Sequence, residues 1–109
     1  MSAENGIVVA QTVLDDESLA YDIAQGAVEA RLAAGAHVDA RMTTFTRWKE
    51  TVRHERQYRV SFQTTPERVA ELREWVHARH TGEAPQWFLV PVTGPTETYL
   101  DWTRTSTVR

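Results

Sequence analysis

A histidine and a glutamate three positions apart are the leading candidates for chemistry in this 109-residue sequence. His80 and Glu83 lie where a helical pattern gives way to a loop, and His77 lies one turn earlier on the same side. Imidazole and carboxylate groups at this spacing could bind a divalent metal such as copper or zinc, or line a pocket. A histidine in the last turn of a helix is also favoured by the helix dipole alone, so a purely stabilising role stays open.

A second set of candidates shares the polar face of an alternating, strand-like segment. Gln57, Arg59 and Gln63 lie on one side of this predicted strand. If that side lines a cleft, a cation beside amides suits a ligand that carries a carboxylate or a carbonyl group. Trp48 would then anchor the packing or stack on the ligand. The same face could equally be solvated.

Patterns for standard catalysis are missing from the sequence. It contains no P-loop, no dinucleotide-binding glycine fingerprint, no serine nucleophile elbow and no His-Glu-x-x-His pair. An enzyme built on this chain would depend on general acids and bases in a cleft, for which the candidates are His80, Glu83, Tyr58 and Asp101. Spacing alone does not decide whether the chain is catalytic.

Composition restricts the partners. There is no cysteine, so a metal site would have to use His, Asp or Glu, and Lys49 is the only lysine. The net charge of -3 and the scattered arginines argue against nucleic-acid binding. No apolar run approaches the roughly 20 residues of a membrane span, and the N-terminus lacks the pattern of a signal peptide. We therefore expect a cytosolic protein that is not inserted in a membrane.

Periodicity predicts a single α+β domain over residues 1–109. The expected elements are a strand at 7–13, a helix at 18–34, a strand at 37–48, a turn around 49–51 with a strand from there to 64, a helix from 65 to about 80, a strand at 87–92 and a short helix at 95–106. This β-α-β-β-α-β order is that of a ferredoxin-like sandwich, with helices covering one face of an antiparallel sheet. Residues 42–65 would form a long ribbon of two strands.

Local signals add detail to these elements. The continuous apolar run at 7–13 predicts a strand that is buried on both faces. Gly35 would cap the first helix, and a phase slip at Phe45 predicts a β-bulge. Thr65, followed by a proline at the first helical position, predicts a hydroxyl-capped second helix. Pro91 cannot donate to a sheet ladder, so the last strand should lie at an edge.

The chain also has more aromatic surface than one layer of helices would hide. These aromatic residues are Trp48, Tyr58, Phe62, Trp87 and Trp102. Because a two-layer sandwich leaves one face of its sheet without helices, we expect this face to be covered by oligomerisation.

Four segments carry a resemblance to CutA-type divalent-cation tolerance proteins that extends over nearly the whole chain. They are RLAAGAHV at 31–38, RWKETV at 47–52, QTTPERVAEL at 63–72 and YLDWTRTST at 99–107. The resemblance implies a ferredoxin-like subunit in a tight homotrimer, in which each ribbon joins the sheets of its neighbours and clefts lie between subunits. It also implies a small cytosolic protein linked to metal tolerance and copper binding, without an established enzymatic activity and related in fold to PII signalling proteins.

The sequence departs from this family at positions that bear on function. Gly35 and Ala36 stand where a cysteine is usual, which removes the soft ligand that copper(I) prefers. Gln57 and Gln63 replace a glutamate and a lysine, and the segment at 80–86 keeps only the histidine, the first glutamate and the proline of the corresponding motif. The presumed cleft therefore contains amides in place of charges.

Three hypotheses follow from the sequence. The first is a cytosolic CutA-like homotrimer linked to divalent-metal tolerance, with weak or no metal binding of its own and no required cofactor. The second is a trimeric scaffold adapted to bind or transform a small molecule in the cleft between subunits, for example as a cyclase, isomerase or dehydratase. The third is a structural or regulatory trimer that docks on another protein.

Overall fold

A computed structural model describes residues 6–81 and 85–108 and contains the predicted elements in the predicted order. Their bounds are β1 Val8–Leu14, α1 Glu17–Glu29, β2 Gly35–Trp48, β3 Thr51–Thr64, the 3-10 helix η2 Pro66–Arg68, α2 Val69–Arg79, β4 Phe88–Pro91 and α3 Glu97–Ser106. The elements confirm an α+β sandwich.

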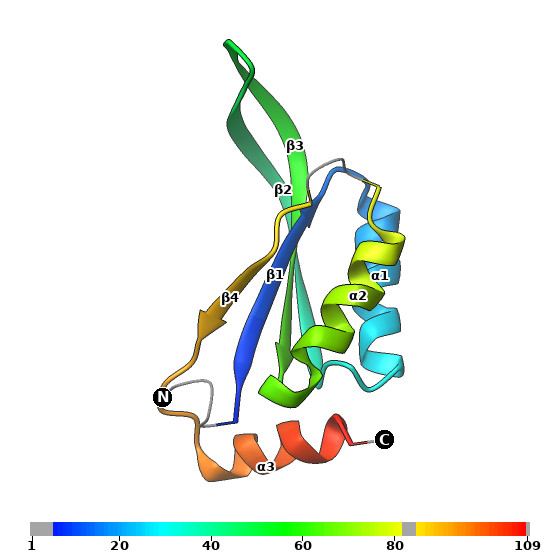
Figure 1. The fold of residues 1–109 in the computed structure, drawn as a ribbon, viewed down its shortest axis with the longest axis vertical. Helices are drawn as coiled ribbons and strands as arrows, with labels where there is room; N and C mark the ends of the chain where they lie inside the picture. Colours follow the sequence, from blue (N-terminus) through cyan, green and yellow to red (C-terminus); the bar gives the residue numbers. More distant parts are fainter. Residues whose placement is uncertain (1–5, 82–84, 109) are drawn as a thin grey trace.

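The four strands form one antiparallel sheet with the order β2-β3-β1-β4, which puts β4 at an edge as Pro91 predicts. Helices α1 and α2 lie side by side on one face of this sheet (Figure 1). The outer halves of β2 and β3 project beyond the body as a twisted ribbon, and α3 crosses the foot of the sheet at the opposite end. The second face of the sheet has no helix layer.

Burial follows the two-residue period of the strands. On β3, Val60 and Phe62 are fully buried against α1 and α2, as their alternation predicts. On β1, Ala10 and Thr12 are buried while Gln11 and its face neighbours are only half-buried. The prediction that β1 is buried on both faces is therefore wrong for the subunit, because helices cover only one face.

The ends of α1 show where sequence reasoning succeeds and where it fails. Asp16 caps the helix, since its Oδ1 accepts a hydrogen bond from the Leu19 N–H at 3.1 Å. The helix ends five residues earlier than predicted, because Arg31 takes a left-handed conformation with φ of 62° and the chain then carries Leu32 into the core. Gly35 is not the cap but the first residue of β2.

The predicted bulge exists but lies elsewhere. The register between β2 and β3 shifts between Asp39 and Met42, where Arg41 has a φ of 64°. Phe45 lies in regular register opposite His54, and the two rings stack with centroids 5.6 Å apart. The extra residue is thus absorbed where the ribbon leaves the body, which is where a stronger local twist is needed.

Fewer of the five aromatic side chains named above are exposed than the sequence predicts. Phe62 is buried, and Tyr58 and Trp87 pack against the core, so the helix layer and the α2–β4 connection hide three of the five rings. Trp48 and Trp102 stay about half-exposed. The helix-free face of the sheet carries further exposed apolar side chains, which the sequence did not single out.

Those further groups come from the edge strand. Phe88 pairs with Gln11 and Val90 pairs with Val9 in the ladder, so both side chains share the helix-free face with their partners on β1. Both are about half-exposed in the subunit. An exposed apolar patch of this kind is a candidate contact surface.

Within the described residues, the hydroxyl of Thr12 is the one buried polar side-chain atom without a hydrogen-bond partner. Thr12→Val removes this unsatisfied group at almost unchanged shape, so we expect the free energy of unfolding to rise by about 1 kcal/mol. The matched control is Thr64→Val, because the Thr64 hydroxyl donates to the Leu32 carbonyl at 2.7 Å and its loss should cost about 1 kcal/mol. Urea denaturation at one protein concentration measures both, and a loss of stability in Thr12→Val would contradict this account.

Candidate functional site

A groove of about 510 Å³ opens where the ribbon leaves the body, beyond the end of β1 (Figure 1). Its walls come from the end of β1, from both strands of the ribbon and from the connection between α2 and β4. The lining residues are Val13, Leu14, Asp15, Thr44, Thr46, Trp48, Arg53, Glu55, Gln57, His80, Pro85 and Gln86.

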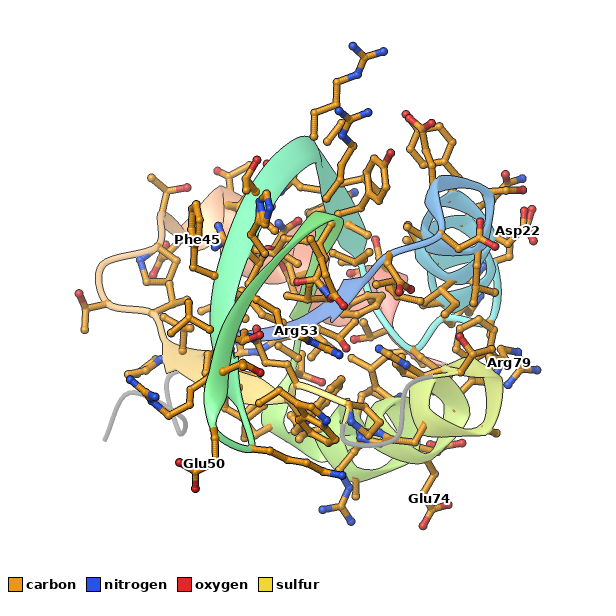
Figure 2. The ribbon with its side chains drawn as sticks, turned by 90° about the horizontal axis from the view of Figure 1, so that it is seen from above. Asp22, Phe45, Glu50, Arg53, Glu74 and Arg79 are labelled. Carbon is orange, nitrogen blue, oxygen red and sulfur yellow. The ribbon has the colours of Figure 1, made fainter. Side chains whose placement is uncertain are left out.

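The ribbon presents these side chains on one face because of strand geometry. Glu55 lies opposite Thr44 and Arg53 lies opposite Thr46 in the antiparallel ladder, and directly opposed residues share a face. Figure 2 shows Arg53 on the side of the ribbon that faces the body, whereas Phe45 lies on the outer side. The inner face of the ribbon is therefore polar and the outer face carries an aromatic ring.

Glu55 is the centre of a short polar chain in this groove. Its carboxylate lies 3.5 Å from Nη2 of Arg53 and accepts a hydrogen bond from Nε2 of Gln57 at 3.3 Å. The guanidinium of Arg53 also lies 5.8 Å from the ring centroid of Trp48, within cation–π range. The side chains of Arg53 and Glu55 are 52% and 43% exposed, so their ion pair is weak and can exchange for contacts with a ligand.

His80 is fixed at the rim of the groove. Its Nε2 lies 2.8 Å from the Val13 carbonyl oxygen. A carbonyl oxygen can only accept, so Nε2 carries the proton and donates this hydrogen bond. Binding of a metal through Nε2 would therefore require this bond to break. Glu83, the predicted partner of His80, lies outside the described residues.

His77 does not join His80, contrary to the spacing argument. Its Nδ1 lies 2.8 Å from the Arg73 carbonyl oxygen one turn earlier, and its ring packs edge-on against Trp87 with centroids 5.5 Å apart. His77 is not among the residues that line the groove.

The groove unites three of the predicted cleft residues, Trp48, Gln57 and His80. The sequence analysis did not select Arg53 and Glu55, which also line the groove. The signal that could have found them is the period of two, because residues 53, 55 and 57 must share one face of β3.

The other predicted site residues lie elsewhere in the subunit. Arg59 forms an ion pair with Asp39, with Nη1 and Oδ2 3.7 Å apart. Tyr58 points to the opposite face of β3 and packs against the core, and Asp101 is exposed on α3 at the foot of the sheet (Figure 1). The subunit therefore does not bring Tyr58, His80 and Asp101 together as a catalytic group.

Gln63 belongs to a second polar cluster, on the helix-free face near α3. Its Nε2 lies 2.8 Å from Nδ1 of His37, and its Oε1 accepts a hydrogen bond from the Tyr99 hydroxyl at 3.4 Å. Tyr99 also packs against Trp102, with ring centroids 5.2 Å apart. The amide can donate to an imidazole and accept from a phenol at the same time, which a charged lysine at this position could not do.

Gly35 makes room for this amide. A Cβ atom at position 35 would lie 2.6 Å from Oε1 of Gln63, closer than real Cβ contacts allow. The glycine and the glutamine are therefore linked sterically, and the side chain at 35 decides whether Gln63 can bridge His37 and Tyr99.

Within residues 6–81 and 85–108, no group of three or more His, Cys, Asp or Glu side chains is close enough to hold a metal ion. None of the helices there is long and apolar enough to cross a membrane.

An antiparallel β-α-β-β-α-β sandwich with a projecting ribbon is the fold that the sequence resemblance implies. The chain belongs to the CutA1 divalent ion tolerance protein family, whose model matches residues 7–106.

Individual relatives agree with this assignment. The divalent-cation tolerance protein CutA of Thermus thermophilus is 32% identical over 91 residues, which cover 84% of this chain and 88% of that protein. The structure of CutA from Synechococcus elongatus PCC7942 superposes with a TM-score of 0.91 at 28% identity and covers 95% of this chain and 92% of its own. The same protein complexed with Bis-Tris gives a TM-score of 0.86 at 29% identity and 93% coverage of both chains.

The link between Gly35 and Gln63 is testable by a double-mutant cycle. In the wild type, Gly35→Ala pushes the amide away from His37 and Tyr99, whereas in a Gln63→Ala background there is no amide to displace. We expect Gly35→Ala to be less favourable in the wild type by about 0.5–1 kcal/mol of unfolding free energy. Equal effects in the two backgrounds would show that the positions are independent.

Proposed function

We propose that this chain is a cytosolic CutA-type homotrimer that binds a small polar organic molecule in the groove at the base of its ribbon. The observation that carries the proposal is the chain of Trp48, Arg53, Glu55 and Gln57 on the groove-facing side of the ribbon. A volume of about 510 Å³ lies within the range of roughly 300–1,000 Å³ that is usual for small-molecule sites.

The groove offers complementary groups for one class of ligand. Arg53 supplies donors in a fixed fork, Glu55 supplies acceptors, and Gln57 supplies both. Trp48 supplies a flat apolar surface. Ligands with hydroxyl, amine or carboxylate groups on a short carbon frame match this set. Bis-Tris, a polyhydroxylated amine present in a CutA structure from Synechococcus elongatus, belongs to the same chemical class and supports the proposal.

The trimer is the second part of the proposal, and exposed apolar surface supports it. Phe45 and Val52 on the ribbon are 69% and 63% exposed in the subunit, and Phe88 and Val90 are exposed on the helix-free face of the sheet. Burying these groups against neighbouring subunits removes apolar area from water and covers the uncovered face. The groove then lies beside a neighbouring subunit, which would complete its walls.

A divalent cation is the second candidate ligand. Family membership favours it, and Asp15, Glu55 and His80 all line the same groove. In the described structure these three groups are not close enough to form a ligand set, so cation binding would require them to move together. Copper or zinc binding through His80 and Glu83 stays a prediction, as does catalysis in a specialised pathway.

Titration calorimetry with Bis-Tris as the probe, in a phosphate-free and amine-free buffer, tests the organic-ligand proposal. We expect saturable binding that Arg53→Gln weakens by about tenfold, because a hydrogen bond from a charged donor is lost. Arg73→Gln is the matched control, since it makes the same charge change on α2 away from the groove and should leave the affinity unchanged.

The same calorimetry with copper and zinc separates the two candidates. Under the proposal, tag-free protein binds these metals weakly, and Bis-Tris affinity does not depend on them. Tight stoichiometric metal binding that is lost in His80→Ala, together with no binding of Bis-Tris, would replace the organic ligand by the cation.

A further inference from the structure

A second cavity lies at the foot of the domain, at the opposite end of the sheet from the groove (Figure 1). It is an open hollow with a volume of about 820 Å³, lined by Gly6 before β1, by Thr65 and η2, and by the C-terminal end of α3 with the two residues that follow it. None of the described residues lines both this cavity and the groove. Its polar lining is dominated by two arginines and two threonines.

Arg68 is held rigidly at the wall of this cavity. Its Nε donates to the Thr107 carbonyl oxygen at 2.7 Å, and its Nη1 donates to Oε1 of Glu71 at 3.1 Å. These bonds fix the plane of the guanidinium, whose side chain is mostly buried. A guanidinium has further N–H donors beyond these two, and they are presented in a predetermined orientation.

Arg104 contributes a second cation from α3. Its guanidinium lies beside Gly6, where a Cβ atom would be 3.2 Å from Nη2, so the glycine permits this close approach. With the residues that the structure describes, the Arg104 guanidinium forms neither an ion pair nor a hydrogen bond. The cavity therefore contains a positive charge without a protein counterion among these residues.

Thr65 adds a hydroxyl to the lining of the cavity. The residue is only 5% exposed, yet its side chain makes no capping hydrogen bond to the helix that follows, contrary to the sequence prediction. The neighbouring Thr107 differs, because its hydroxyl donates to the carbonyl oxygens of Thr103 and Arg104 and so secures the end of α3. The Thr65 hydroxyl is not one of the fully buried atoms, so a ligand in the cavity can take the place of water as its hydrogen-bond partner.

From these groups we propose that the cavity is a binding site for a small oxyanion, a carboxylate or phosphate group on a compact molecule. Arg68 and Arg104 approach it from two elements that are far apart in sequence, and Thr65 donates a third hydrogen bond. Pro66 and Val108 supply apolar contacts for the remainder of the molecule. The proposal is independent of the groove and of its ligand.

Glu67 places a negative charge in the same cavity, so its removal tests whether the site binds anions. It is exposed, lines the same cavity, and has no ion pair with the described residues. Glu71 already pairs with Arg68, so Glu67 opposes the charge that Arg104 brings to the cavity, and this carboxylate should reduce the affinity for an anion. Removal of this charge should therefore strengthen binding, whereas removal of the Arg104 charge should weaken it.

Occupancy of the site would connect two parts of the fold. The anion would bridge η2, which follows β3 directly, and the last turn of α3. The first turn of α3 carries Tyr99, which contacts Gln63 on the helix-free face. A bound anion would thus stabilise the docking of α3 on the sheet, and the thermal midpoint should rise with anion concentration.

Two-dimensional amide NMR of the full chain at low ionic strength tests the site, with inorganic phosphate and succinate as separate probes. We expect saturable shifts at Thr65, Arg68, Arg104 and Thr107 with at least one probe, and the tighter probe identifies the oxyanion as phosphate or carboxylate. Arg104→Gln should weaken binding by about tenfold, Glu67→Gln should strengthen it several-fold, and Arg73→Gln should leave it unchanged.

A folding defect is not expected to cause the weaker anion binding of Arg104→Gln. Arg104 is exposed, so the thermal midpoint of unliganded Arg104→Gln should match that of the wild type. Absence of saturable shifts with both probes would overturn the proposal, and so would an Arg104→Gln variant that binds as tightly as the wild type. Shifts confined to the residues of the groove would also overturn it, because they would place the anion at the other end of the domain.

Discussion

The ribbon imposes the main physical constraint on this molecule. Two fourteen-residue strands, β2 and β3, pair with each other well beyond the end of β1, so their backbone hydrogen bonds are satisfied where no other strand or helix supports them. Their side chains have no layer to pack against in the subunit. The two-residue period gives a largely polar inner face and an outer face on which Phe45 and Val52 lie among Arg47, His54 and Arg56, and each face needs a different partner. The inner face lines the groove, and neighbouring subunits would cover the outer face.

The bulge at residues 39–42 determines how the ribbon serves the groove. Below it, β2 and β3 are part of the main sheet and Val38 packs against the core. Above it, the shifted register places Met42 opposite Gln57, and the alternate pairs Thr44–Glu55 and Thr46–Arg53 line the groove. The strain of a left-handed Arg41 is thereby localised at one residue. His80 then fastens this side of the groove to the end of β1 through its bond to Val13.

The order of the elements could be predicted because it depends on local signals. Alternation in β3, the acidic cap of α1 and the proline of β4 each leave a pattern that is readable without tertiary context. The left-handed conformations of Arg31 and Arg41 could not be predicted, since a glycine would be expected at such positions. The end of α1 and the position of the bulge were misjudged for this reason.

The site residues that could be predicted are those whose signal lies within a short segment of the sequence. Trp48, Gln57 and His80 were found because a strand face and a helix end are properties of short segments. Arg53 and Glu55 were missed because opposite charges close in sequence look like a solvated pair. The cavity at the foot of the domain was out of reach, because the bond that joins Arg68 to Thr107 spans 39 residues and has no local signature.

The central claim is that the ribbon and the helix-free face are buried in a homotrimer, which places the groove beside a neighbouring subunit. Sedimentation equilibrium of the tag-free protein at micromolar concentration tests it most directly. A single species of three times the 12.4 kDa subunit mass is the predicted result. A stable species of subunit mass, with Phe45 and Val90 in water, would contradict the account.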